Sequence, residues 1–213
     1  LKGSSNYASW IDVLNSATGN NTAGNDVKLT LNSTIQEAAQ QALEGYNGAC
    51  VVIDPETGAI LAMASSPTYD AGDVESILSG GGDSSALYNR ATQALYSPGS
   101  TFKIVSLTTA LENNVATEQS VYSAPSTLEI GGGEVTNFNG ASYGDITLER
   151  ATELSVNTVF AQLGTEIGSE GLVNSSEEFG FNQEISFDLP LVTSLMPDPN
   201  EMTEWETAWA SAG

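Results

Sequence analysis

The sequence predicts an α+β domain in which helices cover the faces of an antiparallel sheet. Two apolar segments joined by a turn, 48–54 and 59–65, predict a β-hairpin. Most of the other periodic segments have helical spacing. Two good strands and a helix-rich remainder do not bury each other well, so we expect further strands of the sheet to lie beyond Gly213.

The first part of the chain leads from a polar segment into the hairpin. Residues 1–26 are rich in Ser, Asn, Gly and Thr, apart from a short helical pattern over 7–14, and predict a linker or the edge of a preceding module. Residues 27–31 alternate like a strand, and a helix capped by Ser33 follows. The main domain is therefore expected to run from 27 to 213.

The second half has helical periodicity in five segments: 100–113, 147–153, 156–167, 170–179 and 201–211. The first of these has a broad apolar surface, which predicts a mostly buried helix. The region between the first two is expected to be irregular or β. The glycine triplet at 80–82 predicts a surface loop, because a phosphate-binding loop would need a helix with Lys and Ser or Thr after it.

Composition excludes several classes of function. There are 27 acidic residues against 5 basic ones, which argues against nucleic-acid binding because no basic patch can be assembled. The single cysteine, Cys50, lies in an apolar run and excludes an intrachain disulfide. The chain has no histidine, so a Ser-His-Asp arrangement and a His-based zinc site are impossible within it. A catalytic base would have to be Lys, Tyr, Asp or Glu.

The strongest local signal is the run SPGSTFK, which ends at Lys103. Pro98 and Gly99 permit a tight turn into a helix, and the N–H groups and dipole of a helix N-terminus favour negative charge at Ser100. Residues three apart face each other on a helix, so the Lys103 amine can fold back to the Ser100 hydroxyl. Apolar neighbours would lower its pKa from about 10.4 and make it a base. The alternative is that Ser100 only caps the helix and that Lys103 extends into solvent.

A second pattern, Ser155-Val156-Asn157, lies at the junction of two helical segments. Its hydroxyl and carboxamide can point into one cleft, to relay a proton and to hold a substrate amide. The alternative is an N-cap serine with a polar neighbour.

These two patterns resemble the S-x-x-K and S-x-N motifs of penicillin-binding proteins and serine β-lactamases. Further segments resemble the transpeptidase domain of the penicillin-binding branch, in order along the chain: 29–32, 51–65, 89–91 and 96–100. The resemblance covers 27–213. The polar segment before it has no glycosyltransferase features and is more similar to a monofunctional class B protein than to a bifunctional one.

The resemblance implies the fold of that family and acyl transfer in two steps. Ser100 attacks the carbonyl between the two terminal D-alanines of a peptidoglycan stem peptide, Lys103 takes the proton, and an amine of a neighbouring strand attacks the acyl-enzyme. Ser155 passes the proton to the leaving D-alanine, and Asn157 holds the amide side of the substrate. A β-lactam antibiotic would leave Ser100 acylated, and neither a metal nor an organic cofactor is required.

The third motif of the family, K-[ST]-G, is absent, since no lysine follows Lys103. In relatives its strand supplies a cationic residue for the substrate carboxylate and one of two backbone donors of the oxyanion hole. Losing one such donor costs on the order of a hundredfold in rate. We therefore expect the chain as written to be weakly active or inactive unless a second chain supplies the rest.

Other readings of the same residues stay open. A D,D-carboxypeptidase or a β-lactamase would let water attack the acyl-enzyme, and a class A β-lactamase would need a deacylating glutamate. Glu177 and Glu178 follow the second motif, but nothing in the sequence places them at the site. A penicillin-sensing or peptidoglycan-binding domain would not turn its ligand over. In each case we expect an extracytoplasmic location in a bacterium, a membrane anchor upstream of Leu1, and cell-wall synthesis partners that bind through regions outside this chain.

Overall fold

The computed structural model describes residues 26–213, which form two compact units divided between Thr68 and Tyr69. The predictions made for residues 1–25, including the helix over 7–14, lie outside the described residues. No helix in the described part of the chain is both long enough and apolar enough to cross a membrane.

The first unit consists of the helix α2 (Ser33–Ala42) packed on a hairpin of β1 (Gly48–Ile53) and β2 (Ile60–Ser66). The strands pair antiparallel, as predicted. Gly58 has φ 72° and donates its N–H to the Asp54 carbonyl over 2.8 Å, which closes the turn. Ala39 of the helix lies in a small core with two alanines of β2.

Two predictions for this unit are wrong. Residues 27–31 form no strand, because a single backbone hydrogen bond, from Asn32 N–H to the Leu61 carbonyl, links this stretch to β2. Its alternating apolar side chains meet no sheet face and stay exposed, Val27 at 80%. The cap of α2 is Asn32 and not Ser33: the Asn32 Oδ1 accepts hydrogen bonds from the N–H groups of Thr34 and Ile35.

The second unit begins with short helical segments: η1 (Ala71–Asp73), α3 (Val74–Leu78), η2 (Ser84–Leu87) and α4 (Arg90–Gln93). The glycines at 80–82 lie in the exposed turn between α3 and η2, as predicted.

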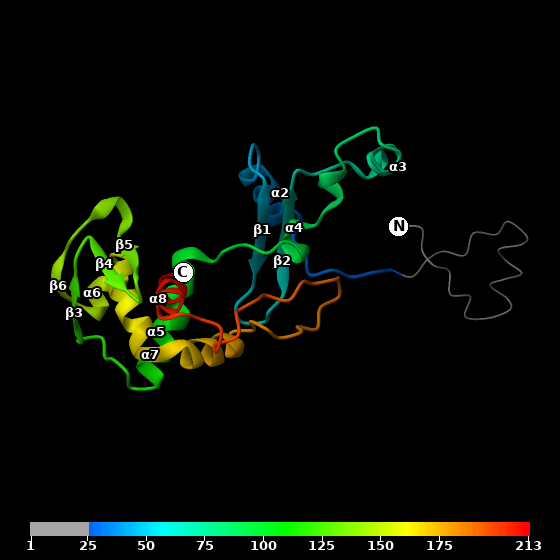
Figure 1. The fold of residues 1–213 in the computed structure, drawn as a ribbon. Helices are drawn as coiled ribbons and strands as arrows, with labels where there is room; N and C mark the ends of the chain where they lie inside the picture. The colour runs from blue at the N-terminus through cyan, green and yellow to red at the C-terminus, as the bar shows by residue number, and fades with distance from the viewer. Residues whose placement is uncertain (1–25) are drawn as a thin grey trace, which may run out of the picture. The chain divides into compact units, whose positions relative to one another are not determined.

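The core of the second unit is helical, and its elements are η3 (Gly99–Phe102), α5 (Lys103–Glu112), α6 (Leu148–Glu153), α7 (Asn157–Glu178) and α8 (Glu204–Ala212). All five helical predictions are confirmed. Gly168, with φ 77° and ψ 161°, interrupts α7 between the two segments that were predicted as separate helices. The helices α5 and α8 pack against α7, around fully buried side chains such as Phe160 and Leu163 (Figure 1).

Four strands of four residues each complete the unit: β3 (Val121–Ala124), β4 (Thr127–Ile130), β5 (Gly133–Thr136) and β6 (Gly144–Thr147). β3 pairs with β6 and β4 with β5, both antiparallel. The described residues therefore contain three two-stranded sheets together with the helices. The α+β class is confirmed.

The helix α8 lies against the β4–β5 hairpin and against α7. A Cβ at Gly133 would lie 2.4 Å from the Trp205 ring, so only glycine allows this contact. The indole N–H groups of Trp205 and Trp209 both donate to the Glu134 carbonyl, each over 3.1 Å. A Cβ at Gly164 of α7 would lie 2.4 Å from the Ser211 Cβ, so α7 and α8 cross in close contact. The position of α8 is thus fixed from two sides.

Candidate active site

Ser100 lies in the 3₁₀ turn that leads into α5. Gly99 before it has φ 56°, a conformation that favours glycine, and the Thr101 hydroxyl donates to the Pro98 carbonyl over 2.7 Å. Phe102 is buried and packs edge-to-face on Phe181, with ring centroids 5.5 Å apart. The turn is therefore held from inside while the Ser100 side chain stays exposed.

Lys103 is the first residue of α5 and is only 5% exposed. Its Nζ donates to the Ser100 Oγ and to the Asn157 Oδ1, both over 2.9 Å, and to the Ala212 carbonyl oxygen over 2.6 Å. The ring of Phe160 lies 5.5 Å from the same nitrogen. Burial lowers the pKa of the Lys103 amine from 10.5 to about 8, because the charged form loses its water. An amine of this kind can take a proton from the hydroxyl beside it.

Asn157 opens α7 and connects Lys103 to the neighbouring hairpin. Its Oδ1 accepts from Lys103, and its Nδ2 donates to the Thr136 carbonyl at the end of β5 over 2.9 Å. The next residue, Thr158, donates its N–H to the Oδ1 of buried Asn137, whose Nδ2 donates back to the Thr158 hydroxyl. The β5 end therefore fixes the first turn of α7.

Ser155 lies between α6 and α7 with φ 54°, which is rare for a residue other than glycine. The Ser155 N–H donates to the Thr152 carbonyl and the Val156 N–H to the Ala151 carbonyl, over 3.1 and 2.9 Å. This pair of bonds is the Schellman ending of a helix, with serine at the position that glycine usually takes. The reading of Ser155 as an N-cap is wrong, since it ends α6 and Val156 occupies the N-cap of α7.

The structure brings three of the four predicted residues into one hydrogen-bonded set: Ser100, Lys103 and Asn157. The Ser155 hydroxyl is exposed and makes no hydrogen bond within residues 26–213. Glu177 and Glu178 lie at the far end of the 22-residue α7 from Asn157. Neither carboxylate is bonded to this set.

Sequence reasoning missed two participants in the site. Asn137, which holds the start of α7, lies in a region predicted only as irregular or β, and its sole sequence signal is a turn-forming stretch of Asn and Gly. The Ala212 carbonyl has no sequence signal at all, because every residue carries one.

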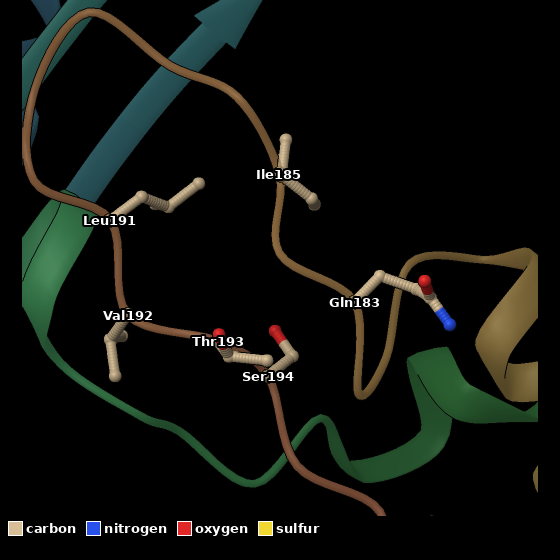
Figure 2. A pocket seen from close by; sticks show the side chains of 6 residues that line it. All are labelled: Gln183, Ile185, Leu191, Val192, Thr193 and Ser194. Atoms are coloured by element: carbon tan, nitrogen blue, oxygen red, sulfur yellow. The ribbon is translucent and has the colours of Figure 1, made fainter.

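A concave region lies in the loop after α7, and its lining does not include these residues. It has a volume of about 180 Å³, and Figure 2 shows its lining on two passes of the loop: Gln183, Ile185, Leu191, Val192, Thr193 and Ser194. None of these side chains is titratable or bonded to the Ser100 set. Among the described residues, this region therefore offers no acid–base group, and Ser100 and Lys103 remain the candidate reactive pair.

Comparisons with known proteins agree with this geometry. The family described as "Penicillin binding protein transpeptidase domain" matches residues 48–213. The D,D-transpeptidase domain of a peptidoglycan glycosyltransferase from Eggerthella lenta has 56% identity and a TM-score of 0.86, over 95% of this chain and 50% of that one. An imipenem acyl-enzyme complex of penicillin-binding protein A from Mycobacterium tuberculosis has 29% identity and a TM-score of 0.82, over 96% and 51%.

Among curated proteins, the peptidoglycan D,D-transpeptidase PbpA of Mycobacterium tuberculosis is 35% identical over 185 residues, which cover 78% of this chain and 38% of that protein. The chain thus spans about two fifths of the length of this relative. The family match covers most of the chain, and so the chain belongs to the penicillin-binding protein transpeptidase domain family.

Proposed function

We propose that this chain carries the acylation site of a peptidoglycan D,D-transpeptidase, with Ser100 as nucleophile and Lys103 as its general base, within a partial transpeptidase domain at 27–213. The observation that carries the proposal is the 2.9 Å hydrogen bond between the Lys103 Nζ and the Ser100 Oγ, made by an amine that is 5% exposed. A serine is activated when a base lies within hydrogen-bond reach of its hydroxyl and a third group holds that base in place.

Acylation would proceed with the residues in these roles. The neutral Lys103 amine accepts the Ser100 proton as the Ser100 Oγ attacks the carbonyl carbon between the two terminal D-alanines of a stem peptide. The Ser100 N–H faces the oxyanion that forms. When the C–N bond breaks, Ser155 gives a proton to the departing D-alanine nitrogen, and Lys103 returns the proton through Ser155. The exposure of Ser155 and its position two residues from Asn157 support this role.

Asn157 is proposed to hold the substrate. Its Oδ1 and one of its two N–H groups are already engaged, by Lys103 and by the Thr136 carbonyl. A carboxamide has two N–H donors, so one remains for the carbonyl of the substrate amide. The bond to Lys103 means that the same side chain aligns the base and the substrate.

In the proposed reaction an amine of a second stem peptide resolves the acyl-enzyme, and a β-lactam would form a long-lived adduct on Ser100. The imipenem acyl-enzyme named for the mycobacterial relative supports this behaviour. Water activated by a glutamate in the class A manner is not favoured, because neither Glu177 nor Glu178 is bonded to Ser100, Lys103 or Asn157. Because peptidoglycan is the substrate, the proposed site works on the extracytoplasmic face of the bacterial membrane, where other cell-wall proteins are its partners.

Intact-protein mass spectrometry after incubation with penicillin tests the proposal. We expect a single covalent adduct to form slowly on the parent, which lacks one oxyanion-hole donor, and none to form on Ser100→Ala. The same incubation is repeated on a version extended to the length of the curated relatives. An adduct on the extended version alone would mean that the oxyanion hole of this chain is incomplete, and not that Ser100 is wrongly assigned as the nucleophile. An adduct that survives in Ser100→Ala, or no adduct on either version of the parent, would overturn the proposal.

A further inference from the structure

The three acceptors around Lys103 do not play the same part in proton transfer. A charged ammonium has three N–H donors, which match the Ser100 Oγ, the Asn157 Oδ1 and the Ala212 carbonyl oxygen. The neutral amine that can act as a base has two N–H donors and one lone pair. If its two N–H groups stay on Asn157 and Ala212, the lone pair faces Ser100. The Ala212 carbonyl therefore determines the direction of the Lys103 lone pair as much as Asn157 does.

The Ala212 carbonyl belongs to the last turn of α8, where a helix leaves its carbonyl groups without partners of its own. Two residues of α5, one turn apart, bind this end of α8. Lys103 donates to the Ala212 carbonyl over 2.6 Å, and the Ser106 hydroxyl donates to the Ser211 carbonyl over 2.8 Å. Ser106 is fully buried, with an exposed fraction of 0%. The Ser106 bond thus fixes the peptide group that precedes the one Lys103 uses.

The rest of α8 is held by contacts of a different kind. The Trp205 and Trp209 indoles bind the Glu134 carbonyl, and Ser211 packs against Gly164. These contacts lie upstream of Ala212 and set where the helix lies. Ser106 is the described side chain, apart from Lys103 itself, that hydrogen-bonds to its final carbonyl groups.

We infer that Ser106 is a positioning residue of the acylation reaction: by holding the Ser211 carbonyl it fixes the Ala212 carbonyl, which takes one N–H of the neutral Lys103 amine and turns the lone pair toward Ser100. This inference rests on the proposed function of Ser100 and Lys103. Ser106 acts through α8 and touches neither the substrate nor the reacting atoms. Its part resembles that of the third member of a catalytic triad, which orients the base.

A matched pair of variants separates positioning from structural support. Ser106→Ala removes the bond to α8. Thr109→Val removes a hydroxyl that is equally buried on α5 but donates to the Val105 carbonyl of its own helix over 2.8 Å. Both variants lose one buried hydrogen bond, so we expect comparable losses of stability.

The readout is the penicillin acylation rate as a function of pH. Above the Lys103 pKa the amine is neutral and the rate reaches a plateau. The height of this plateau depends on how the lone pair of the amine is oriented toward Ser100 and no longer on the protonation of the amine. We expect Ser106→Ala to lower the plateau by about tenfold or more, because small misplacements of reacting groups cost rate, while Thr109→Val keeps it within about twofold of the parent. Equal plateaus in Ser106→Ala and the parent, or equal losses in both variants, would overturn the inference and leave the proposed function standing.

A second measurement does not depend on activity. The ¹³Cε resonance of Lys103 reports its protonation directly. A fixed carbonyl acceptor stabilises the charged amine, so we expect the Lys103 titration midpoint to fall in Ser106→Ala and to stay unchanged in Thr109→Val. An unchanged midpoint in Ser106→Ala would count against the inference, and this result does not depend on whether the chain is acylated.

Discussion

The hairpin unit and the Lys103 region of this chain are built from contacts of very different range. The hairpin turn closes between Asp54 and Gly58, and the cap of α2 spans three residues from Asn32. The Lys103 amine instead reaches partners 54 and 109 residues away in the sequence, and the Ser106 hydroxyl a partner 105 residues away. Local chemistry thus specifies the first region, and tertiary packing specifies the second.

The two regions also differ in how well they exclude water. Three buried residues form the core of the hairpin unit, whereas eleven form the largest core of the helical unit. The lowered pKa of Lys103 comes from that second core, because desolvation of the amine is its cause. A change that disturbs packing near α8 should therefore alter chemistry, and a change in the hairpin unit should alter only local stability.

Among changes to the packing near α8, Gly164→Ala should cause the largest loss of stability and of acylation rate. The added Cβ would lie 2.4 Å from the Ser211 Cβ, so α8 must move away from α7. We expect the free energy of unfolding to fall by ~1–3 kcal/mol, as for overpacked cores, and the acylation rate to fall as well, because α8 carries the Ala212 carbonyl. Denaturant unfolding followed by tryptophan fluorescence measures the first effect.

Gly48→Ala in β1 is the matched control for this variant, because nothing lies within 4 Å of its added Cβ and its φ is not positive. We expect little change in either quantity. If Gly48→Ala and Gly164→Ala lost equal stability, the loss in Gly164→Ala would not come from the close crossing of α7 and α8.

Asn32→Ala should have a smaller effect, confined to the hairpin unit. It removes the side chain that accepts from the N–H groups of Thr34 and Ile35, a change that typically costs ~1 kcal/mol. Hydrogen exchange at those two amides should speed up while the acylation rate stays at the parent value. Slower acylation of Asn32→Ala would show that a change in the hairpin unit does affect the chemistry at Ser100, contrary to the comparison made above.

The sequence predicted what short-range chemistry determines. The Pro-Glu-Thr-Gly turn predicted the hairpin, Thr147 indicated the start of α6, and the i, i+3 spacing placed Lys103 beside Ser100. Residues 27–31 show the limit of this reasoning, because alternation makes a strand only where a partner edge and a face to bury are present.

The remaining parts of the site depend on contacts that a pattern does not encode. The strand β3 pairs with β6 across about twenty residues, from Ala124 to Gly144, which contain the whole β4–β5 hairpin. The two indoles that fix α8 share one backbone carbonyl, that of Glu134, and a backbone carbonyl leaves no mark in the sequence. The αL conformation of Ser155 belongs to the local Schellman ending of α6, but the usual sequence signal for that position is glycine, so a serine there did not reveal it.

The most direct test of this account is the ¹³Cε titration of its lysines. The chain has three, Lys2, Lys28 and Lys103, so every resonance can be followed, and Lys103→Met assigns the one that matters. We predict that the Lys103 resonance titrates near pH 8, where its pKa lies, while an unperturbed lysine titrates near 10.4.

A pKa near 8 would leave about a tenth of the Lys103 amines neutral at pH 7, and acylation should rise with pH through the same midpoint as the proton is lost. Coincidence of the acylation midpoint with the Lys103 titration is the result that the account predicts. If the Lys103 resonance titrates near 10.4, Lys103 is not a desolvated base, and the central claim fails.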